Sequence, residues 1–315
     1  MEMRTLGRTG LRVSRIGLGL AALGRPGYIN LGHGLDLAGR TDVAEMERHA
    51  HGVLDAAFER GVVYFDAARS YGKAEEFLAS WLTRRQVSSA VVTVGSKWGY
   101  TYTAEWRVDA EQHEVKDLSV GTLRRQLAES RALLGDHLDL YQIHSATLES
   151  GVLEDDEAAA ELERLRAAGV AIGLTVTGPS QAETIERAVE LGRFDTVQAT
   201  WNLLERSAGS ALERAHACGM GVIVKEALAN GRLTARGDVR RLQAEADRRG
   251  TSADALALAA CLAQPWLDVV LSGATTVEQL DSNLAALELT YNGELDDLAE
   301  APDGYWARRA ALPWN

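Results

Sequence analysis

VVYFDAARSYG, residues 62–72, joins a short β-branched apolar run to a polar turn. The run 62–66 has the length and composition of a buried strand, and it ends at Asp66. A polar residue at the end of an apolar strand is typical of parallel α/β folds, whose functional residues lie at the carboxyl ends of the strands. This segment therefore predicts one strand of an α/β protein, with a functional side chain at the carboxyl end of that strand.

Runs of the same kind recur along the chain, with longer amphipathic stretches after them. The alternation predicts parallel βαβ units, and eight such units predict a closed (β/α)8 TIM barrel. The expected strands are 15–19, 62–66, 91–96, 138–144, 171–176, 196–199, 221–225 and 269–272. The expected helices include 43–60, 120–134, 155–168, 181–191 and 277–287.

Other segments complete the expected barrel. Residues 4–13 carry Arg-Thr-Gly between short flanks, which favours a β-hairpin at the barrel bottom. The last crossover has two helical stretches, 238–249 and 253–262. Loops 23–40 and 99–117 are long and open on the carboxyl-terminal face, which indicates function. No Ser-rich or Pro-rich linker interrupts residues 1–315, so we expect a single domain.

Composition excludes several classes of protein. The 46% hydrophobic and 25% charged content is typical of a globular chain, and the net charge of −12 disfavours binding to nucleic acid or an anionic membrane. We expect a cytoplasmic protein, because neither a signal core nor an apolar stretch of ~18 residues is present. Cys218 and Cys261 lie in alanine-rich helical stretches, which predicts buried thiols and no metal site.

Four reactive side chains follow the expected strands. Asp66 ends the second strand and Tyr71 follows it, Lys97 closes VVTVGSK (91–97), and His144 closes LDLYQIH (138–144). Each alone has an ordinary structural explanation, such as helix capping or packing. An acid, a phenol, an amine and an imidazole at neighbouring strand ends together favour catalysis.

This set of residue types suits hydride transfer to a carbonyl. Reduction creates an alkoxide, which needs a proton donor and nearby positive charge. We expect Tyr71 to be the general acid, and the base in the oxidative direction. Lys97 would lower the phenol pKa, Asp66 would hold the lysine, and His144 would orient the substrate oxygen.

The contexts YFDAARSYG, VGSKWG and DLYQIH resemble the tetrad motifs of the aldo-keto reductases, over nearly the whole chain. The opening LGRTGLRVSRIGLG (6–19) and LSGATTVEQLDSNLAAL (271–287) resemble the family's amino-terminal hairpin and its cofactor-binding helix. The resemblance implies an oxidoreductase that uses NADP(H) or NAD(H) without a Rossmann fold. It also implies that Tyr71 is the proton donor.

The resemblance carries over to the nicotinamide end of the cofactor with departures. The family's Gly-x-Ser-Asn is here Gly-Leu-Thr175-Val176, in which the threonine alone can bind the carboxamide. Gln198 matches the carboxamide-binding glutamine, and Trp201 replaces the tyrosine that stacks on the nicotinamide ring.

At the phosphate and adenine ends, the resemblance implies roles for several residues. Lys225 or Arg232 is expected to bind the pyrophosphate. Gly273, Gln279 and Asn283 match the family pattern near the adenine, whereas Thr275 and Thr276 stand where NADPH-specific members carry Arg or Lys. We therefore expect weakened NADP preference and possible use of NAD.

The substrate is expected to be a small carbonyl or alcohol, such as an aldehyde, ketone or sugar. Candidate pocket residues are aromatic: Tyr28, Trp98 and Tyr100, and Trp306 or Trp314. Two alternatives stay open, a nucleotide-binding regulatory subunit of the same fold and a Schiff-base aldolase with Lys97 as nucleophile. The sequence leaves open whether the chain is a monomer or a homo-oligomer.

Overall fold

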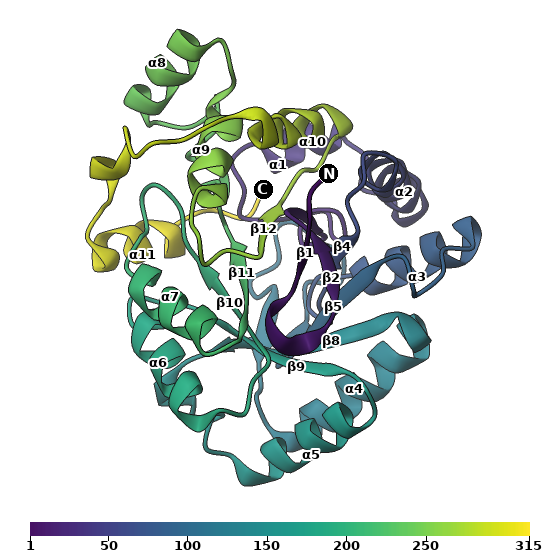
Figure 1. Ribbon diagram of the computed structural model, residues 1–315. Helices are drawn as coiled ribbons and strands as arrows, with labels where there is room; N and C mark the ends of the chain where they lie inside the picture. The colour runs from purple at the N-terminus through teal and green to yellow at the C-terminus, as the bar shows by residue number, and fades with distance from the viewer.

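The computed structural model describes all residues from Met1 to Asn315. Eight parallel strands form a closed barrel in the order β10-β11-β12-β3-β4-β5-β8-β9, and helices surround them (Figure 1). These strands are β3 (Ile16–Gly19), β4 (Tyr64–Asp66), β5 (Thr93–Trp98), β8 (Leu138–Ala146), β9 (Ala171–Val176), β10 (Thr196–Thr200), β11 (Gly221–Lys225) and β12 (Val269–Ser272). The predicted (β/α)8 barrel is confirmed.

The helices pack their apolar faces on the strands and bury one continuous core between the two layers. In α2, for example, the Asp42 carboxylate caps the first turn by accepting from the amides of Ala44 and Glu45 at 3.0 and 3.2 Å. The helices are α1 (His33–Leu37), α2 (Val43–Glu59), α3 (Ala74–Arg85), α4 (Val120–Leu134), α5 (Asp156–Ala167), α6 (Gln181–Leu191), α7 (Gly209–Ala217), α8 (Arg240–Arg249), α9 (Ala253–Leu262), α10 (Val277–Leu284) and α11 (Pro302–Ala310).

The predicted hairpin, β1 (Met3–Thr5) and β2 (Arg12–Ser14), lies across one end of the barrel (Figure 1). Leu6 from its turn is buried in a small apolar cluster that includes Ile223 and Val269. Gly7 approaches the start of β11 so closely that an added Cβ would lie 2.2 Å from the Gly221 nitrogen. This packing closes the amino-terminal end of the barrel and leaves the carboxyl-terminal end for a site.

Several local expectations need correction. The segment 23–40 contains α1, and the segment 99–117 contains an antiparallel pair, β6 (Tyr100–Tyr102) and β7 (Glu114–Lys116). Cys261 is buried as predicted, but Cys218 is exposed because it stands at the solvent-facing end of α7. No helix is long and apolar enough to cross a membrane.

Candidate active site

A cavity of about 620 Å³ opens at the carboxyl ends of the barrel strands. This volume falls within the range of about 300–1,000 Å³ typical of ligand and cofactor sites. At one end the wall contains Asp66, Tyr71 and His144, and at the other it contains Thr275 and the first turns of α10. Titratable side chains therefore line one end of the cavity, and a threonine and a helix terminus line the other.

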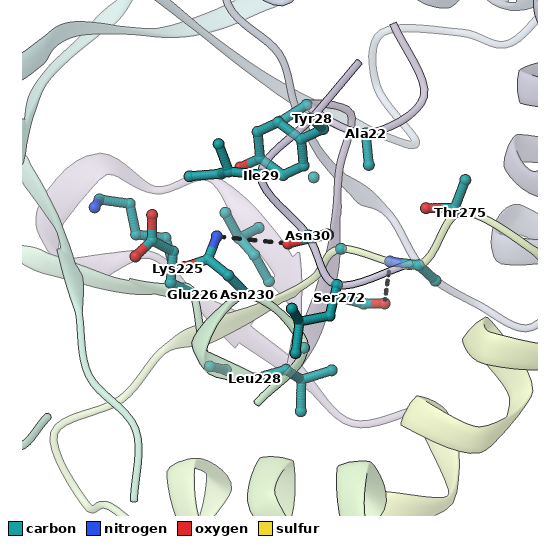
Figure 2. Close-up of a pocket in the computed structure, with 18 of the residues that line it drawn as sticks. Ala22, Tyr28, Ile29, Asn30, Lys225, Glu226, Leu228, Asn230, Ser272 and Thr275 are labelled. Atoms are coloured by element: carbon teal, nitrogen blue, oxygen red, sulfur yellow. Dashed lines mark hydrogen bonds between the residues drawn. The ribbon is translucent and has the colours of Figure 1, made fainter. Parts of the chain in front are cut away.

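Two loops far apart in the sequence meet at this cavity. The Leu31 amide donates to the Asn230 carbonyl at 3.0 Å, and the side chains of Asn30 and Asn230 face each other at 3.5 Å (Figure 2). Beside them, the Arg236 guanidinium donates to both oxygens of Asp36 at 2.6 and 2.8 Å. The loops that follow β3 and β11 are thus joined by backbone, amide and ionic contacts.

The backbone around the cavity is unusually strained. Ser145, Glu226 and Asn230 all line the cavity and have φ values of 59°, 52° and 54°. This left-handed region is uncommon for residues other than glycine, and such residues gather at functional sites.

Asp66 and Lys97 form a buried ion pair at the base of the cavity. The ammonium group of Lys97 also donates to the Ala67 carbonyl at 2.9 Å. The side chains are 2% and 1% exposed, so neither charge is solvated. Lys97 lies within β5 and does not line the cavity, so its charge acts from behind the wall.

Asp66 is further held by neutral donors from inside the barrel. Its Oδ2 accepts from Gln198 at 3.0 Å, from the Tyr64 hydroxyl at 3.2 Å and from Gln142 at 3.4 Å. These hydrogen bonds keep the carboxylate oriented toward Lys97.

Two cationic side chains lie close to the ring of Tyr71. The Lys97 ammonium is 4.9 Å from the centre of its ring, and the Arg25 guanidinium is 5.2 Å from it. Burial raises the pKa of Tyr71 well above 10, and the Asp66 carboxylate raises it further, while Arg25 opposes both. The phenol is therefore held protonated, and the net shift of its pKa is opposite to the lowering expected from Lys97.

His144 completes the group, with its ring 5.5 Å from that of Tyr71 in an edge-on arrangement. Its Nδ1 lies 3.4 Å from the Ser70 hydroxyl, and the Tyr100 ring is 5.0 Å away. Burial lowers the pKa of His144 well below 6.5, and the charge on Lys97 lowers it further. A neutral imidazole thus faces the cavity and can hydrogen-bond an oxygen atom there.

Most of the residues assigned to the cofactor by resemblance line the cavity: Gln198, Lys225, Gly273, Thr275, Gln279 and Asn283. Lys225 donates to the Thr200 hydroxyl at 2.9 Å, and burial lowers its pKa to about 8. The Gln279 side chain accepts from the Thr275 amide at 2.8 Å and fixes the start of α10. Figure 2 shows Lys225 and Thr275 on opposite sides of this part of the cavity.

Three of the expected cofactor residues lie elsewhere. The Thr175 hydroxyl is buried and accepts from the Ser145 amide at 2.7 Å. Trp201 is buried and packs edge-on against Trp266 at 5.6 Å, because it follows β10 on the helix side. Arg232 pairs with Glu300. None of the three lines the cavity, so the structure does not bring them to the expected ligand.

Only some of the aromatic residues that were expected to contact the substrate line the cavity. Tyr28, Tyr100 and Trp314 line the cavity. Trp98 and Trp306 do not, because Trp98 is fully buried in β5 and Trp306 is buried in α11.

Two charged pairs at the site are not predictable from the sequence pattern. Arg25 is almost fully buried, pairs with Glu114, and lies 4.8 Å from the centre of the Trp314 ring. Glu226 pairs with Arg309 through contacts of 2.8 and 3.0 Å that connect β11 to α11. Burial alone would raise the pKa of Glu226, but Arg309 and then Lys225 lower it to about 2.

The donors and open space of the cavity fit an extended dinucleotide. The side-chain oxygen of Asn230 is buried in the wall without a partner, and a Cβ added at Gly273 would meet nothing within 4 Å. Lys225 adds a cation between the two ends. No cluster of three or more His, Cys, Asp or Glu side chains is placed to hold a metal ion.

The chain is similar to proteins of known class over nearly all its length. It is 28% identical to the uncharacterized oxidoreductase YrpG of Bacillus subtilis, over 96% of this chain and 98% of that protein. It is 27% identical to an L-galactose dehydrogenase of Arabidopsis thaliana, over 91% and 88%, and to a D-threo-aldose 1-dehydrogenase of a Pseudomonas species, over 67% and 69%.

Solved structures show the same fold. The holo form of aldo-keto reductase AKR11C1 from Bacillus halodurans superposes with a TM-score of 0.74 at 23% identity, covering 96% of this chain and 97% of that one. A putative aldo-keto reductase from Pseudomonas aeruginosa superposes with a TM-score of 0.66 at 26% identity, covering 91% and 95%. The model of the aldo/keto reductase family matches residues 15–295, and the chain therefore belongs to this family.

Proposed function

We propose that the chain transfers a hydride between a nicotinamide dinucleotide, NADP(H) or NAD(H), and a small carbonyl or alcohol. The observation that carries this proposal is the convergence of Asp66, Tyr71, Lys97 and His144 at one end of the cavity. The bound nicotinamide would supply or accept the hydride.

In the reductive direction, Tyr71 donates its phenolic proton to the substrate oxygen as the hydride reaches the carbonyl carbon. Its raised pKa keeps that proton in place at neutral pH. Neutral His144 donates a hydrogen bond to the same oxygen, and the Lys97 charge stabilises the phenolate that remains until solvent returns the proton. In the oxidative direction each transfer is reversed.

For the substrate we propose an aldose or a related polyhydroxy compound. Two similar proteins are named as sugar dehydrogenases. The rings of Tyr28 and Trp314 line the cavity with apolar surface, and the Arg25–Glu114 pair offers hydrogen-bonding groups to hydroxyls. This combination suits a ring with alternating C–H and O–H groups.

The aldolase alternative receives no support from the geometry. Lys97 is 1% exposed, is paired with Asp66 and does not line the cavity, so its nitrogen is not presented to a substrate carbonyl. A regulatory subunit would bind the dinucleotide without turnover.

The test is Tyr71→Phe, assayed with a panel of aldoses, aldehydes and ketones in both directions. Loss of the proton donor should lower kcat by about 10²–10⁴-fold, with dinucleotide affinity unchanged by fluorescence titration. Full activity in this variant would refute the role of Tyr71. Binding of the dinucleotide with no turnover by the unmodified protein would favour the regulatory alternative.

A further inference from the structure

A second hollow adjoins the cavity at its α10 end. It has a volume of about 480 Å³ and is lined by Arg40, Glu45, Arg48, His49, Thr276, Val277 and Glu278. Glu278 lines both spaces, so the hollow is next to the part of the cavity that contains Thr275 and Gln279.

Two guanidinium groups in this hollow have no carboxylate partner. Most arginines of the chain form ion pairs, but Arg40 and Arg48 form none. The Nε of Arg40 is buried without any hydrogen-bond partner, and its Nη2 donates only to the Asp36 carbonyl at 3.3 Å. Two arginines that line one hollow without carboxylate partners favour binding of an anion, above all a phosphate.

The hollow is also fixed in shape. His49 on α2 lies 2.6 Å from the Thr275 carbonyl through its Nε2, and the Thr276 hydroxyl caps α10 by accepting from the Gln279 amide at 3.2 Å. Arg60, which follows the last residue of α2, pairs with Asp281 on α10. The amino-terminal end of α10, which favours negative charge, is thereby held beside the two arginines.

The hollow contains two carboxylates as well, those of Glu45 and Glu278. Both residues are exposed. Their charge opposes an anion, so removal of one of them should have the opposite effect from removal of an arginine.

We propose that this hollow binds the 2′-phosphate of NADP(H), with Arg40 and Arg48 supplying the positive charge that Thr275 and Thr276 lack. The inference rests on the proposed function, because it assumes the adenine end of the dinucleotide near Gln279 and Asn283. It reverses the expectation of weakened NADP preference, because Arg48 on α2 and Arg40 just before that helix lie far in sequence from the β12–α10 segment.

The experiment measures dissociation constants by calorimetry for NADP⁺, NAD⁺, adenosine 2′,5′-bisphosphate and adenosine 5′-monophosphate. The unmodified protein should bind each 2′-phosphorylated compound at least tenfold more tightly than its counterpart. The double variant Arg40→Met/Arg48→Met should weaken NADP⁺ binding by about 10–100-fold, as expected for lost charge-assisted contacts. NAD⁺ binding should change less than twofold, which also reports that the variant is folded.

Two further variants serve as matched comparisons. Arg131→Met removes an exposed, unpaired arginine on α4, away from the hollow, and should leave all four constants unchanged. Glu278→Gln removes a carboxylate from the hollow and should tighten NADP⁺ binding a few-fold. Equal affinity for NADP⁺ and NAD⁺, or an equal loss of affinity for both in the double variant, would overturn this inference and leave the proposed function in place. Failure of all four compounds to bind would overturn the proposed function with it.

Discussion

Replacing Asp66 with asparagine should destabilise the protein in a way that depends on pH. The change keeps the shape of the side chain but leaves the Lys97 ammonium buried without a counter-charge, since both side chains are at most 2% exposed. Breaking a buried ion pair by removing one partner costs about 3–5 kcal/mol. We expect this loss in the free energy of unfolding at pH 7.

The pH dependence follows from the lysine. Burial already lowers the pKa of Lys97 below 10.5, and only Asp66 strongly opposes this, so asparagine should lower it further. The folded variant then binds fewer protons than the unfolded chain over a wider range below pH 10.5, and its stability rises with pH in that range. The difference from the unmodified protein should therefore shrink between pH 7 and pH 10.

Urea denaturation followed by tryptophan fluorescence at several pH values measures both effects. The double variant Asp66→Asn/Lys97→Met removes the stranded charge and should recover part of the loss. A cost below 1 kcal/mol at pH 7, or a difference that stays constant up to pH 10, would refute the claim that Lys97 is charged and dependent on Asp66.

Three other predictions concern the cavity wall. Dinucleotide affinity should fall as pH rises through about 8, because Lys225 then loses its charge. Titration at several pH values should show this fall, and Lys225→Met should abolish it. A fall that persists in Lys225→Met would exclude this lysine as the cause. Glu226→Gln should lower stability by about 2 kcal/mol, because the Arg309 pair is largely buried; an unchanged urea midpoint would contradict this. Trp314→Ala should raise KM for the sugar about tenfold through loss of ring contact, with dinucleotide affinity unchanged; equal effects on both would show a general loss of structure instead.

The barrel could be predicted because its strands are short apolar runs whose polar ends mark one face. Asp66 and His144 were recognisable for this reason, since the residue that ends an inward-facing apolar run lies at the cavity. Arg25 does not stand at the end of an apolar run, so no such pattern marks it. It lies in the long loop after β3, where only tertiary contacts with Glu114 and the tail decide its direction.

Residues just beyond a strand were the least predictable part of the site. Trp201 follows β10, where side-chain alternation ends, and the backbone turns its indole toward Trp266 instead of the cavity. Thr175 lies within β9, but its hydroxyl accepts from the amide of Ser145, a residue with positive φ near the carboxyl end of β8. The partners that fix both residues come from other elements of the barrel.

The joined loops after β3 and β11 have a consequence for the rate of turnover. The Leu31–Asn230 and Asp36–Arg236 contacts hold together two loops that both line the cavity, so we expect a dinucleotide bound between these loops to leave more slowly while the contacts are intact. Release of the nucleotide would then be the slow step. A presteady-state burst of product equal to the enzyme concentration would be the kinetic sign of this slow release.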